Sequence, residues 1–306
     1  MTGAAGFVGS HTVDLLLQEG HEVIGVDNLR TGHERNLERA TVNPRFRFVR
    51  QDITEDQAFA VLTTEISPYA IIHLAALVSV PESIREPAEN YRLNVLASRL
   101  VAAGAASANV RRIVFASSAA VYGTSACLPL TEDAECFPVS PYGEAKLDTE
   151  RMFFATAANS GIIVRCHRFF NIFGPRQDPS SAYSGVISRF AAAFRDGLSP
   201  IINGDGEQTR DFISVKDVAR ANLIAATRSD IKSGVANICT GRSISLNRLF
   251  ETMGRIYGHR HSVVHAPNRE GDIQHSLGDP ERARRELGFE ATTSLEDGLR
   301  LMAAIP

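Results

Sequence analysis

Three glycines spaced three residues apart, Gly3, Gly6 and Gly9, open the chain and run directly into a stretch with helical character. Glycines let a diphosphate come close to the backbone, and the free N–H groups of a helix N-terminus bind its charge. The strand-like stretch that follows ends at Asp27, whose carboxylate can accept both hydroxyls of an adenosine ribose and would repel a 2′-phosphate. The spacing therefore predicts a dinucleotide site that favours NAD over NADP.

The start of the chain departs from this pattern. Only Met1 and Thr2 stand before Gly3, whereas a dinucleotide-binding fold has an apolar strand there. Loss of that strand would remove buried ladder hydrogen bonds and core side chains together. Because the rest of the fingerprint is intact, we expect a wrongly assigned or clipped start, with the loss of most of a central strand as the alternative.

Short β-branched runs alternate with helical patterns through the first half of the chain. This alternation indicates βαβ units and a parallel sheet whose strands are buried on both faces. The predicted fold is therefore α/β, a Rossmann-like doubly wound parallel sheet with a smaller C-terminal substrate-binding domain. The expected strands are 21–27, 45–52, 69–74, 112–117 and 162–169, and the expected helices are 9–18, 87–108 and 141–159.

The pattern loosens after Asn171, where residues 174–210 hold many of the prolines and glycines. Further helices are expected at about 215–227 and 246–258. We predict an NAD-binding Rossmann domain over residues 1–170, with its first strand truncated, and a mainly substrate-binding domain over 171–306. Segments near 211–240, including the strand-like 236–239, are expected to return to the first domain.

Composition argues against several classes of partner. Lys and Arg total 32 against 35 Asp and Glu, so the formal charge of -3 provides no basic excess for nucleic acid or an anionic membrane. No apolar run approaches the roughly 18 residues of a membrane helix, and the N-terminus lacks a signal-peptide pattern. Four cysteines without CxxC spacing suit reduced thiols in a cytoplasmic enzyme. His259, His261 and His265 lack paired ligand spacing, so no metal site is expected.

Tyr142 and Lys146 stand at positions i and i+4 of the helical stretch 141–159 and therefore share a helix face. A nearby ammonium stabilises a phenolate, so we expect Lys146 to lower the pKa of Tyr142 from about 10 and to make it a general base. Ser118 follows a buried strand at the edge where such sheets bind ligands, and it can hydrogen-bond a substrate hydroxyl or carbonyl. Ser117 is expected to be a turn residue.

A set of motifs occurs in one order along nearly the whole chain. It comprises the glycine triplet, 73–76 (HLAA), Asn94, 117–123 (SSAAVYG), 140–146 (SPYGEAK), 168–179 (RFFNIFGPRQDP) and 204–212 (GDGEQTRDF). With this ordered set the chain resembles the extended short-chain dehydrogenase/reductase superfamily, within it the NAD-dependent epimerase/dehydratase family, and most closely the UDP-glucose 4-epimerases.

The resemblance implies an isomerase that inverts C4 of a UDP-hexose through a transient 4-keto sugar, with tightly held NAD. It assigns catalysis to Tyr142, Lys146 and Ser118. Asp27 would hold the adenosine ribose, and Asp52 and Ile53 would lie by the adenine. The full set of residues implied to bind NAD is Gly3, Gly6, Phe7, Val8, Gly9, Asp27, Asn28, Asp52, Ile53, Leu74, Ala75, Ala76, Asn94, Ser117, Tyr142 and Lys146.

The resemblance also implies a sugar-nucleotide pocket. Its expected residues are Ser79, Ser118, Tyr142, Asn171, Val186, Arg210, Arg269, Asp272 and Ser276, of which the two arginines would clamp the diphosphate. The small side chain of Ser276 would leave room for an N-acetyl group beside the sugar 2-position. The motifs leave the choice between UDP and dTDP open. The helical faces within 87–108 and 141–159 resemble those that form a homodimer interface in this superfamily.

Two other functions remain as alternatives. Nucleotide-sugar 4,6-dehydratases carry an Asp and a Glu after the catalytic hydroxyl, whereas this chain has Ala119 and Ala120, so elimination would lack its acid/base pair. A non-catalytic NAD-binding regulator would be expected to lose the tyrosine or the lysine, and both are present.

Overall fold

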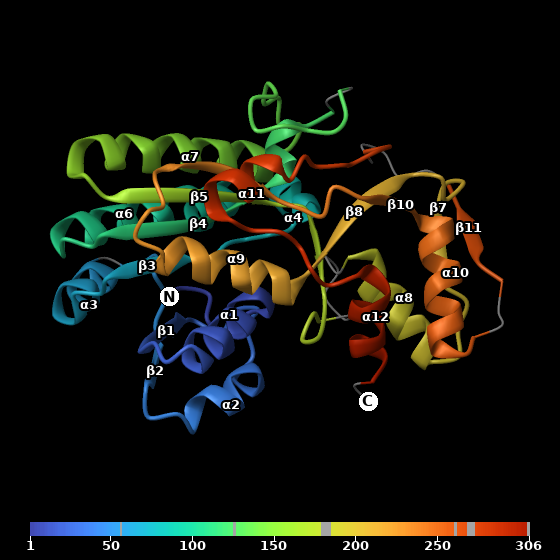
Figure 1. The fold of residues 1–306 in the computed structure, drawn as a ribbon, viewed down its shortest axis with the longest axis horizontal. Helices are drawn as coiled ribbons and strands as arrows, with labels where there is room; N and C mark the ends of the chain where they lie inside the picture. The colour runs from blue at the N-terminus through green and yellow to red at the C-terminus, as the bar shows by residue number, and fades with distance from the viewer. Residues whose placement is uncertain (56, 125–126, 179–184, 260–261, 268–272, 305–306) are drawn as a thin grey trace.

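The computed structural model describes residues 1–55, 57–124, 127–178, 185–259, 262–267 and 273–304, arranged as a large layered body with a smaller lobe beside it (Figure 1). The large body contains β1 (Val23–Asp27), β2 (Phe46–Arg50), β3 (Ala70–His73), β4 (Arg112–Ser118), β5 (Ile163–Phe169) and β9 (Gly234–Ile238). The strands β3-β4-β5-β9 pair in this order, β1 pairs with β2, and all of these pairs are parallel. The predicted doubly wound parallel α/β fold is confirmed.

Thr2 joins the two groups of strands, because it forms parallel bridges with both Val26 and His73. The N–H of Thr2 donates to Ile72 O at 3.0 Å, and the N–H of Val26 donates to Met1 O at 2.8 Å. The amine of Met1 donates to Ile24 O at 2.6 Å, and burial lowers its pKa to about 5. Two residues therefore occupy the place of a central strand between β1 and β3.

Helices cover both faces of the sheet (Figure 1). Phe59, Val101 and Phe153 come from one face and pack with Phe115 of β4 in a single core. Val13 and Ala225 come from the other face and pack with Val114. The first face carries α3 (Ala58–Ile66), α6 (Ala97–Ser107) and α7 (Pro141–Ser160), and the second carries α1 (Phe7–Gln18), α2 (Glu38–Thr41), α9 (Val215–Thr227) and α11 (Glu281–Leu287).

The helix expected over 87–108 is interrupted. It consists of α5 (Pro87–Tyr91), the π-helical segment η2 (Arg92–Leu96) and α6, and it follows α4 (Val80–Arg85). In η2 the amide of Asn94 accepts from Leu77 N and donates to Leu77 O, both at 2.9 Å. These bonds tie the segment to the loop after β3, and such π segments frequently mark functional sites. Two short 3₁₀ segments complete this body, η1 (Glu34–Leu37) and η3 (Ala119–Tyr122).

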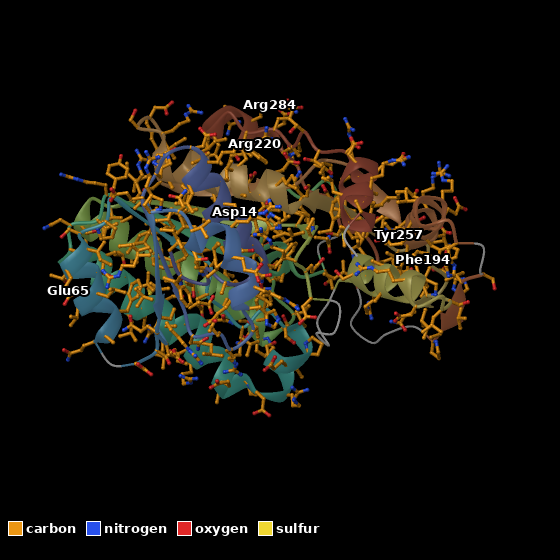
Figure 2. All side chains as sticks on the ribbon, turned by 90° about the horizontal axis from the view of Figure 1, so that it is seen from below. Asp14, Glu65, Phe194, Arg220, Tyr257 and Arg284 are labelled. Carbon is orange, nitrogen blue, oxygen red and sulfur yellow. The ribbon has the colours of Figure 1, made fainter. Side chains whose placement is uncertain are left out.

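The smaller lobe has its own core of Phe190, Phe194, Leu249, Met253 and Leu299. The rings of Phe194 and Tyr257 stack with centroids 5.6 Å apart, and Figure 2 shows these two side chains together in the lobe. Its elements are β6 (Asn171–Phe173), β7 (Ile201–Asn203), β8 (Thr209–Ser214), β10 (Ser243–Ser245), β11 (Val264–Ala266), α8 (Val186–Arg195), α10 (Leu246–Tyr257) and α12 (Leu295–Ala303), with sheets ordered β10-β8-β6 and β11-β7.

Residues 211–240 divide between the two bodies. The helix α9 packs on the large sheet, and β9 pairs in parallel with β5. In contrast, β8 pairs with β6 and β10 and belongs to the smaller lobe. The chain thus crosses into the lobe and returns before it enters the lobe again at β10.

Over the described ranges, none of the helices combines the length and apolar character needed to cross a membrane. The same residues contain no group of three or more His, Cys, Asp or Glu side chains that could hold a metal ion. All four cysteines are free thiols, with Cys166 and Cys239 buried and Cys127 exposed.

Candidate active site

The backbone of the turn before α1 packs too closely to admit side chains at its glycines. Gly3 has a φ of +68°, and a Cβ there would lie 2.7 Å from Ala75 N. A Cβ on Gly9 would lie 1.9 Å from Gly3 O. Gly6 is the N-cap of α1 and forms no side-chain cap bond, so the positive end of the helix, with Phe7 and Val8 in its first turn, faces this turn. This geometry fits a dinucleotide diphosphate.

Asp27 lies at the carboxyl end of β1 and is 9% exposed. Its carboxylate accepts the N–H of Ala5 at 2.9 Å and that of Leu29 at 2.8 Å. Burial raises the pKa of Asp27, and the two backbone N–H groups oppose that shift. Since each carboxylate oxygen can accept more than one hydrogen bond, the group retains capacity for ribose hydroxyls.

A polar network surrounds the expected adenosine region. Asn28 donates to Asp52 Oδ2 at 2.9 Å, and Thr54 donates to Asp52 Oδ1 through its N–H and its hydroxyl. Desolvation would raise the pKa of Asp52, but these hydrogen bonds lower it overall. Arg92 donates to the hydroxyl of Thr54 at 2.6 Å, so helix η2 is tied to the loop after β2, where Ile53 is buried.

The loop after β3 lies against the glycine turn. The N–H groups of Leu74 and Ala75 donate to Thr2, at 3.3 Å to its carbonyl and 3.3 Å to its hydroxyl respectively. Ala76 is half-buried in this loop, and Asn94 fastens the following residue, Leu77. Asn94 also donates to Asn90 Oδ1 at 2.7 Å, so both hydrogens of its amide have protein partners.

The end of β4 and the start of α7 bring the predicted catalytic side chains together. The phenol of Tyr142 is hydrogen-bonded to Ser118, which also accepts the N–H of Ala120 at 3.2 Å. The ammonium of Lys146 lies 5.7 Å from the ring centroid of Tyr142 and donates to Ala116 O at 2.8 Å. Pro141 at the first helical position and Ser140 as N-cap, accepting from Gly143 N, fix the start of α7.

The expected effect of Lys146 on Tyr142 is wrong for the protein alone. Burial raises the pKa of Tyr142, and the lowering contribution comes from the hydrogen bond with Ser118. Burial also lowers the pKa of Lys146 to about 7, with Glu150 opposing the shift. Because this lysine is only partly charged at neutral pH, the two residues do not by themselves produce a phenolate.

Ser117 is also placed differently from expectation. It lies within β4 rather than in a turn, and its hydroxyl donates to Glu150 Oε1 at 2.5 Å. Glu150 in turn accepts two hydrogen bonds from Arg168 of β5, at 2.7 and 3.0 Å. This buried network escaped the sequence analysis, although Glu150 follows Lys146 by one helical turn and so shares its face.

The residues expected to hold the sugar nucleotide lie at the junction with the smaller lobe. Asn171 begins β6 and donates to Asp211 O at 3.1 Å, and Arg210 of β8 donates to Thr209 O at 2.9 Å. The N–H of Ser276 also donates to Thr209 O, at 3.1 Å. Val186 is the first residue of α8. Arg269 and Asp272 fall outside the described residues.

Ser79 and Asp211 have structural roles that the sequence did not reveal. Ser79 is 2% exposed and serves as the N-cap of α4, accepting Glu82 N at 2.9 Å. Asp211 is fully buried and accepts hydrogen bonds from the loop at 240–241, which fastens β8 to the residues after β9. In the sequence, the feature that could have indicated a role for Asp211 is its position next to Arg210 in the motif 204–212.

Comparisons with known proteins agree with this architecture. The model of the "NAD dependent epimerase/dehydratase family" matches residues 1–239. A UDP-glucose 4-epimerase of Mycolicibacterium smegmatis is 35% identical over 98% of this chain and 95% of its own length.

Two solved structures are similar over almost the whole chain. The UDP-glucose 4-epimerase of Thermotoga maritima, solved with UDP-glucose, is 37% identical with a TM-score of 0.93, covering 99% of this chain and 96% of that one. The UDP-N-acetylglucosamine 4-epimerase of Methanobrevibacter ruminantium, solved in complex with UDP-N-acetylmuramic acid, is 36% identical with a TM-score of 0.94, covering 99% and 95%.

Proposed function

Because this chain belongs to the NAD dependent epimerase/dehydratase family, we propose that it is an isomerase that inverts C4 of a UDP-hexose, with NAD as its cofactor. The observation that carries this proposal is the convergence of Ser118, Tyr142 and Lys146 at the carboxyl end of β4. Ligands of open parallel sheets bind at that edge. The similarity to 4-epimerases over nearly the full chain supports the same reaction.

The glycine turn and Asp27 fit NAD, since the turn excludes side chains and the carboxylate suits a free ribose. The residues that would hold it are those predicted above, with Gly3, Gly6 and Gly9 at the diphosphate, Asp27 and Asn28 at the ribose, and Asp52 and Ile53 at the adenine. NAD bound there would supply a hydride acceptor and donor for the sugar C4 and a positive charge on its nicotinamide.

The protein's own residues manage the proton and the oxygen at C4. The phenol oxygen of Tyr142 takes the proton of the sugar 4-hydroxyl as the C4–H bond breaks, which leaves a 4-keto sugar. Ser118 is close enough to the phenol to hold the same sugar oxygen. After the keto sugar turns over, Tyr142 returns the proton to the new 4-hydroxyl, so neither protons nor electrons are consumed.

The junction between the two bodies would hold the sugar nucleotide. Arg210 is the described arginine proposed to bind the diphosphate, and Arg269 and Asp272 complete the proposed set with Ser79, Asn171 and Val186. Ser276 is half-buried and small, which supports acceptance of N-acetylated sugars as well as UDP-glucose and UDP-galactose. The 36% identity to a UDP-N-acetylglucosamine 4-epimerase supports this wider range.

Ala119 and Ala120 argue against the alternative of a 4,6-dehydratase. They begin η3 directly after Ser118 and carry methyl groups where elimination would need an acid and a base. The retained pair of Tyr142 and Lys146 argues against a non-catalytic regulator.

One incubation tests the proposed function. UDP-galactose is added to the NAD-loaded protein and the products are followed by NMR. We expect UDP-glucose, whereas a 4-keto-6-deoxy sugar would identify a dehydratase and an unchanged substrate would identify a regulator. Tyr142→Phe should abolish the conversion and leave NAD binding intact, because it removes only the phenol oxygen.

We further propose that the protein is a cytoplasmic homodimer that pairs through the helical faces within 87–108 and 141–159. Within the first of these ranges the large apolar side chains of Tyr91 and Leu96 are 43% and 38% exposed, which leaves them available to an interface. The helix α7 packs beside them. Light scattering of the wild type and of Leu96→Glu tests the dimer, and we expect the variant to be a monomer.

We also propose the functional division into residues 1–170 for NAD and mainly 171–306 for the sugar nucleotide. In this division, segments near 211–240 belong to the NAD-binding part. The placement of α9 and β9 on the large sheet supports that assignment.

A further inference from the structure

The last three residues of β4 are each bound to a different residue of α7. Ala116 O accepts the ammonium of Lys146 at 2.8 Å. The hydroxyl of Ser117 donates to Glu150 at 2.5 Å, and Ser118 is hydrogen-bonded to Tyr142. Tyr142, Lys146 and Glu150 are four residues apart and so lie along one face of the helix. Two of these contacts involve the proposed catalytic residues, and the third involves Glu150.

Glu150 also holds the neighbouring strand. Arg168 of β5 donates to both oxygens of the Glu150 carboxylate. The side chain of Arg168 is 5% exposed and that of Glu150 is 3% exposed. Ser117 and Arg168 are direct partners in the parallel register of β4 and β5. One carboxylate therefore fastens α7 to two adjacent strands at the edge where the chemistry is proposed.

The charge of Glu150 acts on Lys146 as well. Burial lowers the pKa of Lys146 to about 7, and the carboxylate of Glu150 is the charge that opposes this shift. The other ionisable groups around the pair are His73 on β3, Cys166 on β5 and Tyr122 in η3, together with Tyr142 and with Cys136 in the segment before α7. The carboxylate of Glu150 is the negative charge that acts on the Lys146 ammonium.

A buried ion pair is costly to desolvate and often contributes little net stability. Its position here suggests a task other than stability. Resting on the proposed epimerase function, we propose that Glu150 is a positioning residue: it fixes the ends of β4 and β5 against α7 so that Ser118 meets Tyr142, and its carboxylate favours the ammonium form of Lys146.

The test is Glu150→Gln, which preserves the shape and an acceptor oxygen but removes the charge. The chain has three lysines, Lys146, Lys216 and Lys232, so 13C-lysine NMR can follow the titration of each in the NAD-loaded protein. Loss of a nearby opposite charge shifts a pKa by about one to three units. We expect the Lys146 midpoint, and the alkaline limb of kcat against pH, to move to lower pH by about one unit or more, with Lys216 and Lys232 unchanged.

A matched control is Glu286→Gln. Glu286 pairs with Arg165, another buried arginine of β5, at 2.9 Å, but that pair contacts none of the proposed catalytic residues among the described contacts. We expect this variant to lose stability without moving the Lys146 midpoint or the pH profile. If Glu150→Gln does not fold, Glu150→Gln/Arg168→Gln removes both buried charges, and the Lys146 midpoint should still lie below that of the wild type.

An unchanged Lys146 midpoint in a folded Glu150 variant, with kcat reduced only in proportion to lost stability, would overturn the proposal. The NMR titration needs no turnover, so it reports on Glu150 even if the protein converts no sugar. Inactivity of the wild type with UDP-galactose would instead refute the proposed function.

Discussion

The carbonyl oxygen of Gly3 lies 1.9 Å from the point that a Cβ on Gly9 would occupy. Contact at this distance is far below any van der Waals separation, and the atom in the way belongs to the backbone. The first turn of α1 thus packs directly against the glycine turn that precedes it, and a side chain at position 9 would force the two apart.

We therefore expect Gly9→Ala to weaken NAD binding by at least about tenfold, which corresponds to about 1.4 kcal/mol, and to lower the melting temperature. Calorimetric titration and thermal melting measure both effects. Gly254→Ala in α10 is the control, because a Cβ there meets His259 O at an ordinary 3.6 Å. Equal NAD affinity in Gly9→Ala and the wild type would contradict the proposed diphosphate position.

The second prediction concerns the ion pairs above the adenosine region. Arg30, two residues after Asn28, pairs with Glu89 at 2.5 Å and with Glu82 at 3.5 Å, and hydrogen bonds from Arg92 and Arg30 lower the pKa of Glu89 to about 2. These contacts link the loop after β1 to α4 and α5. Because Arg30 is 42% exposed, the link is worth only about 0.2–1 kcal/mol.

Arg30→Ala should accordingly release NAD about 1.4- to fivefold faster, and the difference from the wild type should shrink in high salt. Stopped-flow displacement of NAD measures the release rate. Arg151→Ala breaks an exposed pair with Asp148 on α7 and serves as the control. A release rate that is equal in Arg30→Ala and the wild type at low salt would show that the pair does not retain the cofactor.

The third prediction concerns stability in acid. Burial lowers the pKa values of His73 and His167 to about 3, so both are neutral in the folded protein at pH values where the unfolded chain binds a proton. The unfolded state takes up more protons between about pH 6.5 and 3. The contribution of these two histidines to the free energy of unfolding should therefore be constant above about pH 6.5. Below that pH the free energy of unfolding should fall as the pH drops.

Urea unfolding at a series of pH values from 8 to 4 measures this dependence. In His167→Asn the slope below pH 6.5 should be shallower, since one of the two neutral histidines is gone. His21→Gln, an exposed histidine before β1, should leave the slope as it is in the wild type. A wild-type curve that stays flat down to pH 4 would show that neither buried histidine resists protonation.

The fourth prediction concerns the sugar 2-substituent. Ser276→Tyr fills the space proposed for an N-acetyl group, so kcat/KM for UDP-N-acetylglucosamine should fall by on the order of a hundredfold or more, as a steric clash of a few kcal/mol implies. The value for UDP-glucose should change little. A parallel loss for both sugars would place Ser276 elsewhere in the pocket, and wild-type protein that epimerises only the hexose would refute the wider range.

The sequence predicts the sheet well because its strands are continuous β-branched runs, and the start of α7 is marked by Ser140 and Pro141. Thus β4 and α7 begin at the predicted residues, Arg112 and Pro141, and differ by a single residue at their ends. The division of the chain into two functional parts and the roles of the individual site residues remain predictions.

Features that depend on packing could not be read from local pattern. The pKa of Tyr142 follows from burial, which neither its spacing from Lys146 nor any motif reveals. The pairing of Glu150 with Arg168 joins residues of α7 and β5 whose contact is set by the tertiary fold. Likewise, Ser117 resembles a turn residue by composition, but the length of β4 is fixed by its pairing with β5.

The π segment at Arg92–Leu96 determines what the chain on either side of it can touch. Each residue of an α-helix advances about 100° around the axis, so one extra residue in a turn redirects the faces that follow. Residues before the segment, in α5, pack beside α4 and α7, whereas those after it, in α6, pack on α3. Straightening this turn would swing Asn94 away from Leu77, so a change in helix phase would release the loop after β3.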